Sequence, residues 1–306
     1  MQVPHDVIEK LLRGACPERE RELADFYRQY QPEFELAQDG PGTKFSARRN
    51  RIAWSYKTIA HDWLLAFAGW KVFVAYMPPI LAAHVTTGEL THDLLAADDG
   101  LLDAEQVFDE VTYCARLARD ADSFESVPWP EAIPPLTDDR ESIPSTEVKA
   151  AFDLACISLA ATFLHEFRHV QFWKDENAPP DLQQEERACD AFSRAFLLER
   201  VTDYCQSSNT DVQRVASKRI MGLATAAYVI DEATPSGLAA GIADTHPPTS
   251  ERFRSLVLEA NAPDDADCWT YAASLVLAGL RRSNRVPKCL SFSSMRDLSH
   301  KLVGLL

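Results

Sequence analysis

The sequence predicts a mainly helical α+β protein with a small β-sheet. Apolar residues recur at helical spacing through most of the chain, and only TKFSARRNRIAWS at 43–55 suggests short strands. Hydrophobic residues make up 46% of the 306 residues and charged residues 25%, which is typical of a soluble globular protein. A chain of this length can bury a large core without disulfides or structural metals.

The first segment, residues 5–38, is expected to be helical. HDVIEKLLRG and ERERELADFYRQY place apolar residues at helical spacing within it. The turn-rich QDGPGTK then interrupts the pattern. Two short strands are expected near 44–55, because Phe45 and Trp54 stand among polar residues.

A long apolar helical pattern covers 57–77, and another follows at 101–120. The run WLLAFAGWKVFVAYMPPILAA at 63–83 is long enough to span a membrane. However, a lysine lies in its middle, and the pair Pro78-Pro79 is expected to break it. We therefore interpret this run as a buried core helix and expect no transmembrane segment.

A proline-rich acidic loop at 121–146 separates two regions of the chain. It contains five prolines in ADSFESVPWPEAIPPLTDDRESIPST, a composition typical of a loop or a region boundary. Residues 1–120 are expected to form a mostly helical N-terminal region, and 147–306 a helical core that carries the functional site. We expect the two regions to fold as one integrated unit.

The second half of the chain is expected to be helical. The run Pro144-Ser145-Thr146 offers an N-cap for a helix that runs to about 173, and Asp181 can cap the next, which is expected to reach about 205. Further helices are expected at 211–231, 249–261 and 265–282.

Charge and cysteine content limit the partners and the compartment. The formal net charge of −15 argues against nucleic acid or an anionic membrane as the main partner. The basic stretch KFSARRNR at 44–51 is the local exception. Seven scattered cysteines without a CxxC pair indicate no disulfide framework, and the charged N-terminus lacks a signal-peptide core. These features predict a reducing, cytoplasmic location.

The stretch HEFRH at 165–169 is the strongest candidate for chemistry. On a helix, His165 and His169 lie on one face, where two imidazoles can reach a single zinc ion. Glu166 lies about 100° further round, beside the metal, where it can act as a base toward water. The apolar run LACISLAATFL before the motif means that these polar groups need a partner, and one zinc ion per chain supplies it.

A catalytic zinc takes three protein ligands and keeps one open position. Glu186 is the preferred third ligand, because Asp190 stands one turn later on the same face and can accept the free N–H of a ligand imidazole. Glu185 competes for the ligand role, but Cys189 rather than an acid lies four residues after it.

His246 lies in DTHPPTSERFRSL at 244–256. It can donate to the oxyanion that forms during peptide hydrolysis, or it can be a surface-loop histidine. The remaining five histidines show no ligand spacing and are expected to be structural: His5, His61, His84, His92 and His300.

HEFRH followed by ERACD at 186–190 has the gluzincin pattern of thermolysin-like zinc peptidases. Over about 144–205 the chain resembles the bacterial Lit family of phage-exclusion zinc peptidases. The resemblance implies a zincin-like fold, with His165, His169 and Glu186 as ligands and Glu166 as general base. It also implies an elongation factor of Tu type as substrate and an activating phage peptide. THPPTSER resembles CAAX-type metallopeptidases, and FSRAFLLE resembles regulatory zinc proteases of mobile elements.

The sequence therefore predicts a zinc-dependent endopeptidase that hydrolyses a host protein. The substrate is expected to lie extended along an edge strand, supplied by SARRNR with RIAWS. Two alternatives remain open: a regulatory protease that cuts a repressor, and a non-catalytic helical immunity or interaction protein with a structural metal.

Overall fold

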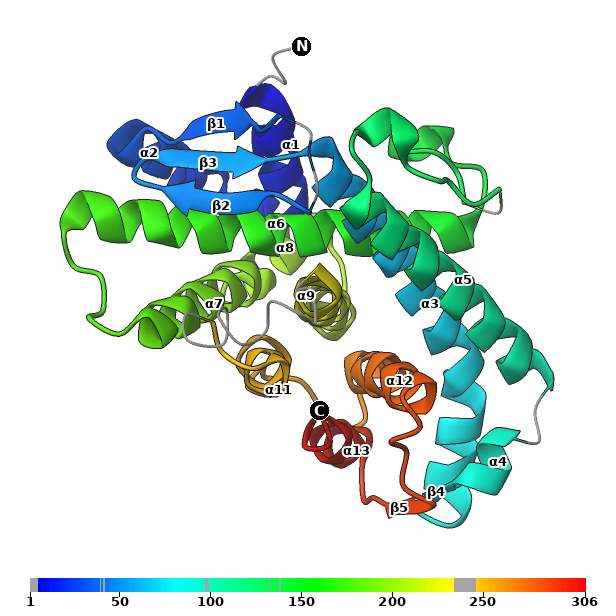
Figure 1. The fold of residues 1–306 in the computed structure, drawn as a ribbon. Helices are drawn as coiled ribbons and strands as arrows, with labels where there is room; N and C mark the ends of the chain where they lie inside the picture. The colour runs from blue at the N-terminus through cyan, green and yellow to red at the C-terminus, as the bar shows by residue number, and fades with distance from the viewer. Residues whose placement is uncertain are drawn as a thin grey trace.

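The structure of the protein, a computed structural model, is mainly helical and contains two small sheets (Figure 1). It describes residues 5–38, 40, 42–96, 99–131, 133–137, 139–233 and 246–306. The predicted mainly helical fold with a small sheet is confirmed, and the chain adds a second, two-stranded sheet that the sequence did not indicate.

The first part of the chain contains α1 (His5–Ala15), α2 (Glu20–Tyr30), β1 (Glu33–Leu36), β2 (Phe45–Arg48) and β3 (Arg51–Trp54). The middle part contains α3 (Tyr56–Thr86), β4 (Glu89–Thr91), α4 (His92–Ala96), α5 (Asp99–Asp120) and α6 (Thr146–Asp175). The last part contains α7 (Leu182–Leu198), α8 (Val201–Ser208), α9 (Val212–Ala233), α11 (Thr249–Phe253), a π-helical turn (Arg254–Leu258), α12 (Asp267–Arg282), β5 (Cys289–Ser291) and α13 (Met295–Val303). Short 3₁₀ turns lie at Pro17–Arg19, Phe124–Ser126 and Arg140–Ser142.

Strand β1 corrects the expectation of a helix over 5–38. In β1, exposed glutamates alternate with half-buried Phe34 and Leu36, which is the period of two that a strand requires. The Phe34 ring packs 5.8 Å from the Phe167 ring of α6, between ring centroids. This contact with a distant helix favours the strand over a continuation of α2.

The three-stranded sheet has the order β1-β3-β2 and places β2 along α6 (Figure 1). β3 is parallel to β1 and antiparallel to β2, with Phe45 opposite Trp54. Among the described residues, β2 pairs only with β3, so β2 is an edge strand. The Phe45 ring packs 4.6 Å from the ring of Phe163, which fixes the strand against the helix that carries HEFRH.

Helix α3 continues to Thr86, so the expectation that Pro78-Pro79 break it is wrong. Its hydrophobic residues pack against neighbouring helices, and 61% of its most apolar window is buried. α3 and α6 are each long and apolar enough to cross a membrane by length and composition alone. Their burial in this fold agrees with the interpretation of 63–83 as a core helix.

Two further predicted helices are interrupted. The expected helix from 182 to about 205 is divided into α7 and α8, and the expected helix over 249–261 is α11 followed by the π-helical turn. In the predicted loop, the described residues of 121–145 contain only two short 3₁₀ turns, and residue 146 already begins α6. The indole Nε1–H of Trp63 in α3 donates to the carbonyl of Pro134 in this loop at 3.0 Å.

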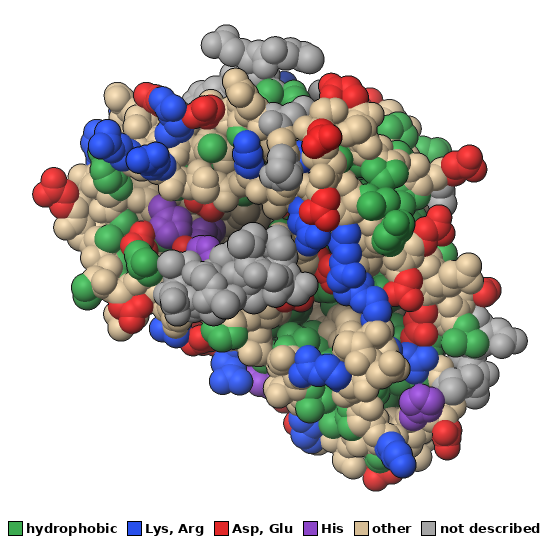
Figure 2. All heavy atoms as spheres, in the orientation of Figure 1, with side chains coloured by type: hydrophobic (Ala, Val, Ile, Leu, Met, Phe, Trp, Pro, Cys, Tyr) green, Lys and Arg blue, Asp and Glu red, His purple; other side chains and the backbone are tan. Residues whose placement is uncertain are grey.

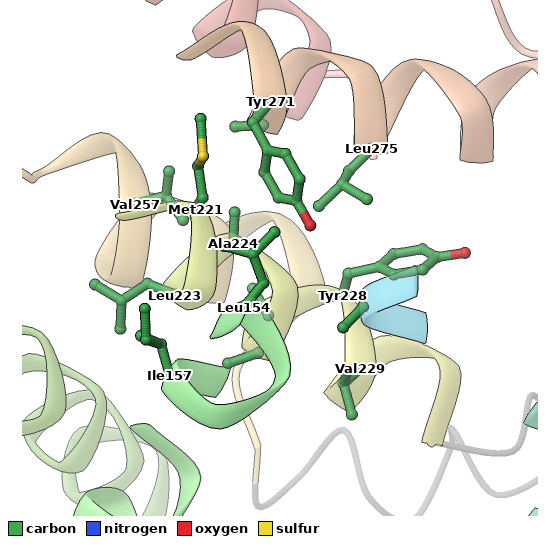
Figure 3. Packing of buried hydrophobic residues seen from close by; sticks show 14 of the residues in the cluster. Leu154, Ile157, Met221, Leu223, Ala224, Tyr228, Val229, Val257, Tyr271 and Leu275 are labelled. Carbon is green, nitrogen blue, oxygen red and sulfur yellow. The ribbon is translucent and has the colours of Figure 1, made fainter. Parts of the chain in front are cut away.

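Helices α6 and α9 cross at the centre of the core. Figure 3 shows Leu154 and Ile157 of α6 beside Leu223 and Ala224 of α9, all of them buried. Gly222 makes the close approach possible, because a β-carbon at this position would overlap Cγ2 and Cβ of Ile157.

We expect Gly222→Ala to lower the free energy of unfolding by about 1–3 kcal/mol, the cost of overpacking a well-filled core. The gain in helix propensity, about 1 kcal/mol, offsets only part of this. Gly279→Ala in α12 is the control, because a β-carbon there meets nothing within 4 Å. Urea denaturation of both variants checks the prediction; equal or higher stability of Gly222→Ala would contradict it.

Candidate metal centre

The HEFRH motif lies about two thirds of the way along α6. Ser145 caps the start of this helix, because its hydroxyl accepts from the backbone N–H of Val148. Helical spacing brings the rings of His165 and His169 to the same face, 5.0 Å apart between centroids. Phe167 points away from them and packs against Phe26, with ring centroids 4.8 Å apart, so it anchors the motif in the core.

Helix α7 returns antiparallel to α6 and carries the acidic partners. Asp181 caps α7 by accepting from the backbone N–H groups of Gln183 and Gln184. The pairing order is reversed between the two helices, since His165 meets Asp190 and His169 meets Glu186. The turn between α6 and α7 therefore sets the register of the site.

Three side-chain groups converge as the ligands of one metal ion would. Nε2 of His165 and Nε2 of His169 lie 3.2 Å apart. The carboxylate of Glu186 places Oε2 3.4 Å from the first nitrogen and Oε1 3.2 Å from the second. Tetrahedral zinc with bonds of about 2.0–2.1 Å separates its ligand atoms by about 3.3 Å. The donor set and its spacing therefore fit a tetrahedral metal ion.

Both imidazoles are oriented by carboxylates on their other nitrogen. Nδ1 of His165 donates to Oδ1 of Asp190 at 2.9 Å, and Nδ1 of His169 donates to Oε1 of Glu185 at 2.7 Å. Such partners fix the ring tautomer and leave Nε2 free for a metal. The sequence treated Glu185 only as a competing ligand; the structure instead places it beside the outer nitrogen of His169.

Cys189 also lies near the two histidines, with ligand atoms of the three residues within 4.8 Å of one another. It is fully buried, and burial together with the charge of Glu186 raises the pKa of its thiol well above the usual range. The Glu186 oxygens lie 3.2–3.4 Å from the two Nε2 atoms, which is the ligand spacing of tetrahedral zinc. Glu186 therefore remains the candidate third ligand, with Cys189 as the alternative.

The charges of the site are strongly coupled. Burial would lower the pKa of His165, but the hydrogen bonds to Asp190 and Glu186 outweigh it and raise that pKa to about 10. For Glu186 burial acts to raise the pKa, yet the three surrounding histidines hold it far below its usual range. In the metal-free site, the positive charge that pairs with these carboxylates is therefore on the histidines, and a bound metal ion can replace it.

Two residues from the segment after α9 reach Glu186. Nη2 of buried Arg252 donates to Oε2 of Glu186 at 2.8 Å, and Nδ1 of half-exposed His246 lies 3.2 Å from the same oxygen. The structure therefore brings His246 to the predicted site. It also adds Arg252, for which the sequence predicted no role at the site.

A cavity of about 1290 Å³ opens beside these residues. Its walls come from β2, α3, α5, α6, α7, the end of α9, the segment from His246 to Leu256 and the end of α12. Glu166 lines it and is 8% exposed. Figure 2 shows histidine side chains in the hollow and lysine and arginine side chains near the sheet and along its border. None of the described residues of 121–146 lines the cavity.

The inner wall of the cavity holds two buried titratable groups of α3, His61 and Asp62. Burial raises the pKa of Asp62 to about 8, although a hydrogen bond from Ser158 acts the other way. Burial also lowers the pKa of His61 to about 4. His61, which the sequence predicted to be merely structural, thus lines the cavity.

Asp62→Asn is expected to alter how stability depends on pH. Between about pH 4 and pH 8 the folded carboxyl keeps a proton that the unfolded chain has released, so wild-type stability falls as pH rises through this window. Asparagine does not titrate, so the stability of the variant relative to wild type should increase from pH 5 to pH 8 and then level off. Urea denaturation at pH 5, 7 and 9 measures this; parallel pH profiles would refute it.

These features define a candidate metallopeptidase centre: a His-Glu-x-x-His helix, an acidic partner helix and a cavity beside an edge strand. The chain matches the family model described as Peptidase U49, the Lit peptidase family, over residues 52–272. It belongs to that family and is a peptidase, which confirms the predicted resemblance and the predicted enzyme class. No curated protein and no solved structure matches the chain.

Proposed function

We propose that the protein is a cytoplasmic, zinc-dependent endopeptidase that cleaves a host protein. The observation that carries this proposal is the triangle formed by the Nε2 atoms of His165 and His169 and the carboxylate of Glu186, with sides of 3.2–3.4 Å. Two imidazoles and one carboxylate at tetrahedral spacing suit zinc better than Mg²⁺ or Ca²⁺, which prefer oxygen ligands.

In this proposal, His165, His169 and Glu186 would hold a zinc ion, which would supply Lewis-acid chemistry: polarisation of the scissile carbonyl and a lowered pKa of water, to about 7. Glu166 takes the proton from the attacking water and passes it to the nitrogen of the leaving amine. His246, at the side of Glu186, donates a hydrogen bond to the oxyanion. Asp190 and Glu185 hold the two imidazole rings in place.

The substrate would bind as an additional strand on β2. Phe45, Ser46 and Ala47 of this edge strand line the cavity, so main-chain hydrogen bonds can hold an extended peptide across the site. The expectation that RIAWS shares this role is wrong, because β3 lies between β1 and β2 and its edges are both paired. Only the SAR part of SARRNR lies in the free edge strand.

The last residue of the free edge strand and the residue after it favour an acidic stretch in the substrate. Arg48 and Arg49 are exposed and have no carboxylate partner among the described residues, whereas Arg51 pairs with Glu35 at 2.9 Å. By resemblance to the Lit family, we propose an elongation factor of Tu type as the substrate and a phage peptide as activator. Repressor cleavage is the competing assignment.

The proposal is tested by incubating the zinc-loaded protein with purified elongation factor of Tu type, with and without phage-derived peptide, and with a bacterial lysate. Labelling of new N-termini followed by mass spectrometry identifies the cut. A single new terminus in the elongation factor supports the full proposal, and a terminus in a repressor would select the regulatory alternative. If folded, zinc-loaded protein produces no new terminus in any of these samples, endopeptidase function is rejected.

A further inference from the structure

The guanidinium of Arg252 in α11 contacts two acids of α7 at the candidate metal centre. Its Nη2 donates to Oε2 of Glu186 at 2.8 Å, and its Nη1 lies 3.5 Å from Oδ1 of Asp190. Asp190 in turn accepts from Nδ1 of His165 at 2.9 Å. The side chain of Arg252 is only 7% exposed, so solvent screens these interactions weakly. One buried cation therefore connects the proposed third ligand with the residue that orients the ring of His165.

The two oxygens of Glu186 have different surroundings. Oε2 lies close to Nη2 of Arg252, at 2.8 Å, and to Nδ1 of His246, at 3.2 Å. Oε1 lies 3.2 Å from Nε2 of His169. Oε2 also lies 3.4 Å from Nε2 of His165, so both oxygens are near enough to the histidine nitrogens to bind the same metal ion. Whether one or both of them bind therefore depends on what else holds Oε2.

The number of carboxylate oxygens that bind decides whether the site has room for a substrate. A carboxylate can ligate a cation through one oxygen or through both. A catalytic zinc site has three protein ligands and keeps one position open, and a second oxygen from Glu186 would occupy that position. A guanidinium forms strong charge-assisted hydrogen bonds with a carboxylate, so Arg252 competes with the metal for Oε2. Oε1 then remains as the ligand atom.

A second arginine–glutamate pair joins the same two helices away from the ligand triangle. α7 and α11 lie side by side (Figure 1), and Nε of Arg187 in α7 donates to Oε1 of Glu251 in α11 at 2.8 Å. The side chain of Arg187 is 39% exposed, whereas that of Arg252 is 7% exposed. If the arginines served only to hold α11 against α7, both pairs would contribute in the same way. Arg187 is therefore the matched control for Arg252.

We propose that Arg252 is a positioning residue that holds Glu186 as a one-oxygen ligand and so keeps a coordination position of the metal open. The inference rests on the proposed function, because it requires Glu186 to be the third ligand. Asp190 contacts the other arm of the guanidinium, so the same cation also stabilises the carboxylate that orients His165.

The visible spectrum of the cobalt(II)-substituted protein tests this role, because a fifth ligand atom weakens the absorption of a tetrahedral cobalt site. Arg252→Met removes the donor and keeps an apolar side chain of similar length. We expect Glu186 to bind through both oxygens in this variant, with a loss of visible absorption relative to wild type. Arg187→Met should keep the wild-type spectrum. An unchanged spectrum in Arg252→Met would overturn the proposal.

Zinc affinity and turnover separate positioning from a general loss of structure. Arg252→Met should bind zinc at least as tightly as wild type in competition with a chromophoric chelator, because Oε2 is released for the metal. Its kcat at saturating zinc should nevertheless fall by about 10–100-fold. Weaker zinc binding together with a wild-type cobalt spectrum would show a merely structural role. If Arg252→Met does not fold, Arg252→Gln replaces it, and its neutral amide is expected to change the spectrum in the same direction by a smaller amount.

The Glu186→Gln background shows whether Arg252 acts through Glu186. A carboxamide offers one oxygen, so Arg252→Met should cause no further change in the cobalt spectrum of Glu186→Gln. An equal change in both backgrounds would overturn the proposal. If Glu186→Gln binds zinc and cobalt like wild type, Glu186 is not a ligand, and this role of Arg252 falls with it. If zinc-loaded wild type cleaves no protein, the peptidase function is rejected, while the cobalt spectra still decide the role of Arg252.

Discussion

Glu166→Gln is expected to lower kcat by about a thousandfold while the protein keeps its fold and its bound metal. Glutamine has nearly the same shape but does not accept the water proton, and general-base catalysis contributes about 10²–10⁴. Glu166 lines the cavity but is not part of the triangle of His165, His169 and Glu186, so the loss of its charge should leave metal content unchanged. Peptide cleavage assays combined with elemental analysis of bound metal measure both effects.

Glu185→Gln provides the matched control, because it removes one carboxylate charge on the other side of the site. Glu185 accepts from Nδ1 of His169, so its loss should weaken metal affinity by about 10–100-fold. Saturating zinc should then restore most of the turnover, whereas it should not rescue Glu166→Gln. If Glu166→Gln keeps full activity with full metal content, Glu166 is not the base and the proteolytic mechanism proposed here is wrong.

Removal of the metal is expected to abolish hydrolysis without unfolding the protein. In the metal-free site His165 pairs with Asp190, and His169 pairs with Glu185 and Glu186, so no buried charge is left alone. Dialysis against a chelator should therefore leave the helical circular dichroism spectrum intact, and one equivalent of zinc should restore activity.

Two variants separate the candidate ligands in this experiment. His165→Ala should retain the fold but fail to regain activity with zinc, because one of three ligands is gone. Cys189→Ser should regain activity like wild type, because Glu186 rather than Cys189 is proposed as the third ligand. If Cys189→Ser no longer bound zinc while Glu186→Gln still did, Cys189 and not Glu186 would be the third ligand.

The sequence predicted much of the candidate site because helical periodicity is enough to place residues on one face. Four-residue spacing brings His165 beside His169 and Glu186 beside Asp190 without knowledge of the tertiary structure. The contact between His169 and Glu185 depends on how the two helices are rotated against each other. In an antiparallel arrangement of α6 and α7, the contact between His165 and Asp190 places both Glu185 and Glu186 near His169. The contact between Glu185 and His169 could therefore have been predicted from the antiparallel arrangement.

Other parts of the site and the fold depend on contacts between distant segments. Arg252 donates a hydrogen bond to Glu186, 66 residues earlier in the chain, and Ser158 donates one to Asp62, 96 residues earlier. No local sequence pattern predicts either pair. β1 was missed because four residues are too few to separate a strand from the end of a helical pattern. The length of α3 was underestimated because its packing against neighbouring helices outweighs the local cost of two prolines.

The free edge of β2 also affects whether two copies of the protein associate edge to edge. An unpaired strand edge can accept a second copy of the same chain as readily as a substrate, which is the usual route to edge-to-edge aggregation. In an antiparallel pair of two β2 strands, Lys44 of each copy would come to lie near Arg48 and Arg49 of the other, so like charges would meet at both ends. The same cations attract an acidic peptide. The charges around this edge therefore disfavour pairing with a second copy of the chain and leave the edge available for an acidic substrate.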